Sequence, residues 1–344
     1  MDKRLTEFSH GAGCGCKIAP ADLENILGQL EPGLIDERLI VGNVSKDDAA
    51  VLDLGDGKAL ISTTDFFTPI VDDAFSFGKI AAANALSDIY AMGGRPVLAI
   101  AILGWPIGKL PLEQAAAVLK GAQAICTEAG IALSGGHSID APEPFFGLSV
   151  SGLVDTNNIK RNDHALDGDL IYITKPIGTG IISTAIKRGQ ALSGHETLIT
   201  EQMSQLNSLG QVLGKVDFIH AMTDVTGFGL LGHLVEVCEG SQVTAVIDFN
   251  EIPLIDKEAI DEYLGKFIFP DNTFRNFNAY KDKCAVLSGR QLQILCDPQT
   301  NGGLLVMVDS KEHNAFESLC KEYGSPVHLI GQMQKKEALF VKLK

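Results

Sequence analysis

The chain has 344 residues, of which 45% are hydrophobic and 21% are charged. This length corresponds to roughly two domains, and the composition is that of a globular protein, which excludes wholesale disorder. The 28 lysines and arginines against 43 aspartates and glutamates give a formal net charge of −15 at pH 7. Duplex nucleic acid is therefore not an expected partner, because phosphate contacts need clustered cations. A polyanionic ligand would need a bridging cation or a local basic patch.

Membrane insertion and export are also not expected. No apolar run approaches about 20 residues, the length that spans a bilayer. Residues 1–7 lead into glycine and cysteine rather than into an apolar stretch, so we expect no secretory signal. The seven cysteines are an odd number. Without an export signal, they indicate a reduced chain in the cytoplasm rather than a disulfide framework.

The N-terminal segment is unusually rich in small residues. Three glycines fall within five positions between Gly11 and Gly15, interleaved with alanine and cysteine. Glycine loses much conformational entropy when it becomes ordered. We therefore predict that residues 1–38 form a mobile arm.

Residues 39–155 are predicted to form a first unit of mixed α+β structure. Two apolar stretches, 50–54 and 59–63, flank Gly55-Asp56-Gly57-Lys58, which is a hairpin signal. Ser76 is expected to cap a helix that ends near Met92, before a pair of glycines. The remaining elements expected here are strands at 97–103, 131–133 and 146–154 and an alanine-rich helix at 112–129.

A polar segment at 155–169 is the predicted boundary to a second α+β unit, which covers residues 156–344. The first strand expected there is 170–174, and a turn around Gly227 is expected to open a helix that ends at Cys238. Further helices are predicted at 181–188, 198–213 and 313–323, and further strands at 244–249, 303–308, 327–330 and 339–341.

Five aspartates, at four places in the sequence, are candidates for binding a hard cation. The pair Asp47 and Asp48 follows a Gly-Asn turn, where it is either a solvated turn or a cation site. Asp65 ends a β-branched strand, Asp88 lies within the first helix, and Asp224 precedes a helix. Each signal is weak alone. Together they indicate carboxylates gathered around Mg²⁺, as in sites that hold phosphates.

Two glycine-rich runs could add anion contacts. The run at 134–138 is expected to end a strand, and the run at 299–303 is expected to start one. Backbone N–H groups exposed in such turns can cradle an anion. The phosphate-binding Gly-x-x-x-x-Gly-Lys-Ser/Thr motif and the protein-kinase motifs are absent, so ATP would have to be bound by another fold.

Cys14-Gly15-Cys16-Lys17 is the candidate reactive site. A neighbouring lysine favours a thiolate, so Lys17 is expected to lower the pKa of a nearby thiol. Two other interpretations remain open: a zinc site that adds His10, and a redox-active cysteine pair. His233 is interpreted as a helix histidine with its hydrogen bonds satisfied, and Cys296 as a core thiol.

Seven stretches, spread in order over nearly the whole chain, resemble one family, the selenophosphate synthetases or selenide, water dikinases. The Asp-Val-Thr-Gly-Phe-Gly string at 224–229 is shared by the wider superfamily of aminoimidazole ribonucleotide synthetases, and the Gly-Cys-Gly-Cys-Lys string narrows the resemblance. The seven stretches are 9–17, 47–51, 62–67, 84–94, 134–140, 223–233 and 296–300.

The resemblance implies an ATP-dependent reaction in which selenide and water yield selenophosphate, AMP and phosphate. It also implies Mg²⁺, a two-domain α+β fold, and a homodimer whose N-terminal domains pair into a shared β-barrel. By the same resemblance, Cys14 and Lys17 are catalytic, and Asp48, Asp88 and Asp224 bind the metal. The residues implied to contact the nucleotide are Lys17, Ser45, Lys46, Asp47, Asp65, Asp88, Gly136, His137 and Ser138.

The departures from the family pattern are small. Ser45-Lys46 stands where Thr-Arg is common, and Asn301 stands where serine or threonine is usual. Two other functions remain open: another ATP-using enzyme of the superfamily, such as a purine-biosynthetic synthetase or a thiamine-phosphate kinase, and a non-catalytic selenium or metal carrier. The cysteine arm argues against the first, and the dispersed aspartates argue against the second.

Overall fold

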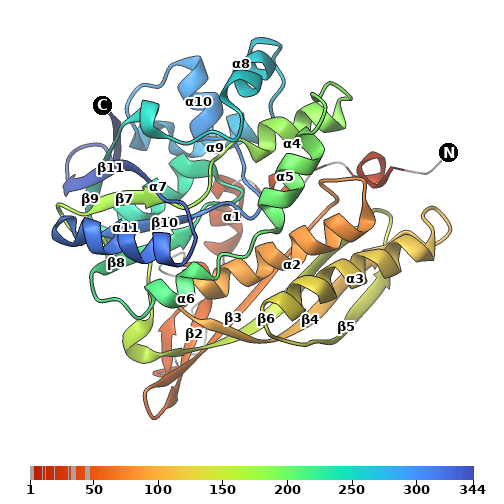
Figure 1. The fold of residues 1–344 in the computed structure, drawn as a ribbon, viewed down its shortest axis with the longest axis horizontal. Helices are drawn as coiled ribbons and strands as arrows, with labels where there is room; N and C mark the ends of the chain where they lie inside the picture. Colours follow the sequence, from red (N-terminus) through yellow and green to blue (C-terminus); the bar gives the residue numbers. More distant parts are fainter. Residues whose placement is uncertain are drawn as a thin grey trace.

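The computed structural model describes residues 4–9, 11, 13–18, 20–29, 31, 36–42 and 47–344. Each of the two units is built on a six-stranded sheet, and the two sheets lie in separate halves of the molecule (Figure 1). Ser45 and Lys46, which the sequence assigns to the nucleotide site, and His10 lie outside the described residues. Neither sheet closes into a barrel within the described chain.

The first sheet has the strand order β1-β2-β3-β6-β4-β5. Its neighbouring strands are antiparallel except for β4 and β5, which run parallel. The predicted hairpin is confirmed, because β2 and β3 pair across a turn in which Gly55, Asp56 and Gly57 all have positive φ. The strands are β1 (Leu39–Val41), β2 (Ala50–Gly55), β3 (Lys58–Phe67), β4 (Arg95–Trp105), β5 (Leu133–Asp140) and β6 (Phe145–Asp155).

Two helices, α2 (Ala74–Ala91) and α3 (Leu112–Glu128), cover one face of this sheet (Figure 1). The two helices can approach closely because Gly78 has no side chain. A side-chain carbon added at Gly78 would lie 1.9 Å from the carbonyl oxygen of Val118. The cap of α2 differs from the prediction: the Asp73 side chain accepts from the Ser76 N–H, so Ser76 lies within the first turn. Helix α2 also packs against the second unit, which buries nearly all of it.

The opposite face of the first sheet is open and apolar. The strand register places Phe66 in line with Gly147 and Ile102, and places Ile100 and Leu98 two and four residues further back along β4 on the same face. Leu98 is 43% exposed, Ile100 42% and Phe66 49%. Isolated exposed apolar side chains are ordinary, but a contiguous group on one sheet face marks an interaction surface.

The glycine-rich run at 134–138 does not form the predicted turn. It lies within β5, which extends to Asp140 at the edge of the sheet. Gly136 has φ +150°, and a side-chain carbon there would lie 2.1 Å from the carbonyl oxygen of Ala101. Gly136 therefore allows β5 to approach β4, whereas Gly135 has open space around it and a positive φ of +84°.

The second sheet has the order β12-β9-β11-β7-β10-β8, and only β12 and β9 are parallel. Strand β8 and helices α8, α9 and α10 were not predicted, although Asp256 caps α8 and Ser288 and Gln291 form a capping box at the start of α10. The helix expected at 198–213 is broken into α5 and α6. The strands are β7 (Leu170–Ile173), β8 (Ile219–Asp224), β9 (Val243–Ile247), β10 (Leu304–Val308), β11 (His328–Lys335) and β12 (Val341–Leu343).

Helices surround the second sheet and extend toward α2 (Figure 1). They are α4 (Thr179–Lys187), α5 (His195–Ser204), α6 (Leu209–Leu213), α7 (Gly229–Ser241), α8 (Lys257–Gly265), α9 (Asn272–Tyr280), α10 (Gly289–Leu295) and α11 (His313–Glu322). Across the described part of the chain, every helix is too short or too polar to span a bilayer.

Candidate active site

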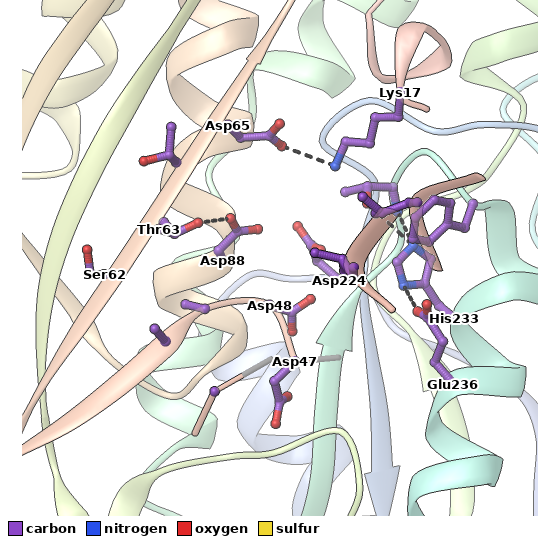
Figure 2. A pocket seen from close by; sticks show the side chains of 18 of the residues that line it. Lys17, Asp47, Asp48, Ser62, Thr63, Asp65, Asp88, Asp224, His233 and Glu236 are labelled. Atoms are coloured by element: carbon purple, nitrogen blue, oxygen red, sulfur yellow. Dashed lines mark hydrogen bonds and ion pairs between the residues drawn. The ribbon is translucent and has the colours of Figure 1, made fainter. Parts of the chain in front are cut away.

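A cavity of about 440 Å³ lies where the first sheet, α2 and the second unit meet. Asp48, Asp88 and Asp224 project into it from three different segments (Figure 2). One oxygen from each of these carboxylates lies within 4.8 Å of the other two. We call these three residues the aspartate cluster.

A hydroxyl group holds each member of the cluster in place. The Thr63 hydroxyl donates to Asp88 at 2.5 Å, and the Thr223 hydroxyl donates to Asp48 at 2.8 Å. The third hydroxyl, from Ser87, donates to Asp224. These three hydroxyls are not among the site residues predicted from the sequence. The available signal was that Ser87 and Thr223 directly precede a candidate aspartate.

Burial and mutual repulsion make the cluster hard to ionise fully without a cation. Burial and the charge of Asp224 raise the pKa of both Asp48 and Asp88 well above the usual range. Burial also raises the pKa of Asp224 to about 6, although the Ser87 hydroxyl opposes this shift. Oδ2 of Asp48 is buried and accepts no hydrogen bond from the described residues. This oxygen-rich, under-neutralised set fits a hard divalent cation.

Lys17 and Asp65 form the other side of the cavity. The Lys17 ammonium lies 3.5 Å from Oδ2 of Asp65 (Figure 2). Burial works against the charge of Lys17, but Asp65 and the neighbouring acids outweigh it and raise the pKa of the lysine. Lys17 therefore keeps its positive charge at the edge of the aspartate cluster, where a phosphate could meet it.

The described part of the predicted arm packs onto the body of the protein. Gly13 pairs with Thr68 in an isolated β-bridge, and the Cys14 N–H donates to the Thr300 hydroxyl at 3.0 Å. On the other side, a side-chain carbon at Gly227 would lie 2.8 Å from the carbonyl oxygen of Cys14. Between these contacts Cys14 is fully buried. The mobility of the arm stays a prediction.

The Cys14 thiol is held as a hydrogen-bond donor. Its Sγ lies 3.3 Å from Oδ1 of Asn84, and the Asn84 amide nitrogen donates to Asp65 at 2.5 Å. Burial and the charge of Asp65 raise the pKa of Cys14 well above the ordinary value. Lys17 lowers the pKa of Cys14, as the sequence predicts, but burial and Asp65 outweigh the lysine and the thiol stays protonated.

Cys16 faces a different environment from Cys14. It is the exposed member of the seven cysteines, and it lines a second cavity that does not include the aspartate cluster. The two sulfurs of the Cys-x-Cys pair thus lie in different surroundings. This arrangement does not favour the alternatives of a shared zinc site or a redox pair.

The remaining predicted nucleotide contacts divide into two groups. Asp47 lines the cavity and accepts from the Asn162 N–H at 3.0 Å. Gly136, His137 and Ser138 instead lie on the exposed edge strand β5 and line a separate cavity. Within one chain they are not brought together with the aspartate cluster.

The 299–303 run is not an open anion cradle. The Asn301 N–H donates to Oδ1 of Asn84 at 2.7 Å, and the Thr300 N–H donates to the Thr179 hydroxyl. Asn301 adopts φ +47°, a left-handed conformation that asparagine tolerates well. Its side chain donates to the carbonyls of Met203 and Gln205, which gives it a structural role.

His233 lines the cavity but is internally satisfied. Its Nε2 accepts from the Thr226 N–H at 3.0 Å, and its Nδ1 lies 3.4 Å from Glu236 (Figure 2). Burial lowers its pKa to about 3, so the ring is neutral near pH 7. This supports the interpretation of a satisfied helix histidine.

The fold and the site define a class of protein. The model of the AIR synthase related N-terminal domain matches residues 46–154, and the model of the corresponding C-terminal domain matches residues 167–344. The chain therefore belongs to the AIR synthase related family. A solved structure titled as the hydrogenase maturation protein HypE in complex with ATP has a TM-score of 0.63 and 19% identity, over 97% of this chain and 90% of that one.

Closer relatives specify the branch of that family. The chain is 54% identical to a selenide, water dikinase of Aeromonas hydrophila over 97% of this chain and 96% of the relative. It is 50% identical to a selenide, water dikinase of Pseudomonas putida over 99% of this chain and 98% of the relative. Within the AIR synthase related family, the chain belongs to the selenide, water dikinases.

Proposed function

We propose that this chain catalyses the ATP-dependent conversion of selenide and water to selenophosphate, AMP and orthophosphate. The observation that carries the proposal is the meeting of three elements at one cavity: the aspartate cluster, the charged Lys17 and the buried thiol of Cys14. The membership of the chain in the selenide, water dikinases supports the same reaction. Among the described residues, no contact favours the activity of another member of the superfamily.

Mg²⁺ is the cation that the aspartate cluster would hold. Asp48, Asp88 and Asp224 supply carboxylate oxygens, the ligands that Mg²⁺ prefers beside substrate phosphates. Bound there, the ion would neutralise phosphate charge during phosphoryl transfer. The hydroxyls of Thr63, Ser87 and Thr223 orient the three carboxylates toward the shared point.

Lys17 and Cys14 carry the part of the chemistry that belongs to the arm. The Lys17 ammonium, held by Asp65, is positioned to contact a phosphate oxygen next to the aspartate cluster. The Cys14 thiol donates to Asn84 and is shielded from solvent. Phosphoryl transfer depends mainly on positioning and charge neutralisation, and an arm that covers the site also excludes water.

A homodimer would complete the nucleotide site. The open face of the first sheet carries Leu98, Ile100 and Phe66, all more than two-fifths exposed, and β5 leaves an unpaired edge. A second copy packed on this face would cover the apolar patch and pair the edges, as in a shared barrel. Residues 136–138 would then reach the nucleotide of the partner, which accounts for their distance from the aspartate cluster of their own chain. Light scattering at micromolar concentration should give twice the chain mass, and a monomer would contradict the dimer.

Phosphorus NMR tests the reaction itself. ATP, Mg²⁺ and selenide under strictly anaerobic conditions should give selenophosphate, AMP and orthophosphate in equal amounts. Cys14→Ser and heat-inactivated protein are the controls. Production of ADP, or of AMP without a selenium-bonded phosphorus signal, would contradict the proposed function.

A further inference from the structure

A second cavity, of about 490 Å³, shares no lining residue with the cavity that holds the aspartate cluster. The arm supplies one wall through Gly15 and Cys16, and helices α4 and α9 supply others. Lys187 of α4 fixes that wall, because its ammonium donates to the carbonyls of Ser9 at 2.9 Å and Gly11 at 3.1 Å. The complete cavity therefore exists only with the arm in its docked position.

The charge of this cavity is opposite to that of the whole protein. The chain carries a formal charge of −15, yet Lys187, Arg188 and Arg275 line the cavity against one acid, Asp271. Lys187 is engaged with the arm, and Arg188 donates to the carbonyl of Phe267 at 3.0 Å. The Arg275 guanidinium makes no hydrogen bond or ion pair with the described residues. A local excess of cations on an acidic protein attracts anions.

One buried polar group in the cavity lacks a partner. Asn272, at the start of α9, is only 6% exposed, and its Oδ1 has no hydrogen bond within the described chain. No other described residue pairs with its side-chain amide. The Oδ1 atom can only accept, but the amide nitrogen is a donor without a partner, and an anion in the cavity would satisfy that donor. Asn272 and Arg275 lie three residues apart on α9 and so share a face.

Cys16 adds a thiol to the cationic lining of this cavity. It is the exposed thiol of the chain, it lines this cavity, and it lies two residues from the buried Cys14. On the basis of the proposed function, we infer that the second cavity is the site where selenide, as the hydroselenide anion, first binds before it reaches Cys14. The Arg275 guanidinium and the Asn272 amide nitrogen donate to the anion, and Cys16 provides a soft sulfur contact.

Hydroselenide suits these groups better than a phosphate does. Hydrogen selenide is a stronger acid than a thiol, so it is an anion at neutral pH. A phosphate would need several donors, but the hydroxyls of Ser183 and Thr184 already donate to the carbonyl of Gly180. The two cavities thus separate a hard, oxygen-lined site for the nucleotide from a cationic, thiol-bearing site for selenium.

Steady-state kinetics of Arg275→Gln test the inference. The KM for selenide should rise about tenfold, the loss expected for one hydrogen bond to a charged group, while the KM for ATP stays unchanged. Arg275→Lys should recover part of the loss. Arg290→Gln is the matched control, because Arg290 is an arginine of α10 in the same unit that does not line the cavity.

Alkylation of Cys16 provides a readout without selenium or turnover. Iodoacetate is an anion and iodoacetamide is neutral, and both alkylate the thiolate with loss of iodide. The ratio of the iodoacetate rate to the iodoacetamide rate should fall in Arg275→Gln and stay unchanged in Arg290→Gln. Peptide mass mapping assigns the modified cysteine.

An unchanged KM for selenide in Arg275→Gln would overturn the inference, even if the enzyme is fully active. Weaker product inhibition by orthophosphate with an unchanged selenide KM would also overturn it, and would assign the cavity to phosphate. Failure of the proposed function looks different: the wild-type protein itself would form no selenophosphate.

Discussion

The Cys14 thiol lies 3.3 Å from Oδ1 of Asn84, on a helix seventy residues further along the chain. The same amide accepts from the Asn301 N–H and donates to Asp65, which in turn pairs with Lys17. Asn84 thus connects the thiol of the arm to its lysine through the body of the protein. It positions both groups in the docked arrangement.

Asn84→Asp should therefore impair turnover without removing nucleotide binding. The substitution keeps the shape of the side chain but sets a carboxylate against Asp65, where the amide now donates. We expect a fall of about tenfold or more in selenide-dependent kcat, from loss of one hydrogen bond to a charged group. Binding of a nonhydrolysable ATP analogue, followed by calorimetry, should change much less. Equal losses in analogue affinity and kcat would show that Asn84 acts on the nucleotide instead.

Removal of one charge from the aspartate cluster should abolish Mg²⁺-dependent ATP consumption. Asp48→Asn, Asp88→Asn and Asp224→Asn each weaken neutralisation of the phosphates. Ser87→Ala keeps all three carboxylates but removes the hydroxyl that donates to Asp224. The Mg²⁺ concentration that this variant needs for half-maximal activity should rise by about 10- to 100-fold. Rates titrated against Mg²⁺ concentration measure both effects. Near-normal consumption in all three asparagine variants would contradict the metal assignment.

The arm residues should separate catalysis from nucleotide binding. Cys14→Ser should abolish selenide-dependent AMP formation and retain nucleotide affinity, because the aspartate cluster lies on other segments. Lys17→Arg keeps the charge but changes its reach and donor geometry, so turnover should still fall. Cys16→Ser should be milder than Cys14→Ser. Full selenophosphate synthesis after deletion of residues 1–17 would remove the arm from the mechanism.

Asp297 should make the stability of the protein depend on pH. Burial raises its pKa from 3.8 to about 8, although Gln299 and the Gly180 N–H favour the charged form. The folded state thus binds the proton more tightly than the unfolded state. The proton on Asp297 contributes fully to the free energy of unfolding below about pH 4. This contribution falls by at most about 1.4 kcal/mol per pH unit as the pH rises, and it is lost once the pH passes about 8.

Urea unfolding of Asp297→Asn at a series of pH values measures this contribution. Between about pH 5 and pH 8 the variant should lose less stability than the wild-type protein, because the titrating group is absent. A parallel decline in both proteins would show that Asp297 does not hold its proton in the folded state.

The sequence predicted the elements whose patterns are strong. The hairpin around Asp56 and the helix that carries Asp88 were both found, because turn residues and helical spacing are local signals. The glycine run at 134–138 was misassigned, since a glycine required by a close strand contact resembles a turn glycine. Helices α8 to α10 were missed although local signals were present, such as the capping box of Ser288 and Gln291 at the start of α10.

In the site, too, the features that depend on neighbouring residues could be predicted, and those that depend on distant segments could not. The aspartates could be proposed from their neighbours in the sequence and from the family resemblance. Two of the hydroxyl contacts, Ser87 with Asp224 and Thr223 with Asp48, join residues more than a hundred positions apart. The burial that raises the pKa of Cys14 also comes from distant segments, and it outweighs the predicted lowering of that pKa by Lys17. Such effects depend on packing, which no local pattern records.

The most direct test of the central claim is AMP release from ATP by the wild-type protein, measured anaerobically with and without selenide. The account predicts that selenide strongly stimulates AMP release and that each AMP is matched by one selenophosphate. It also predicts that Cys14→Ser eliminates the stimulated part. AMP release at the same rate without selenide, and unaffected by Cys14→Ser, would contradict the account.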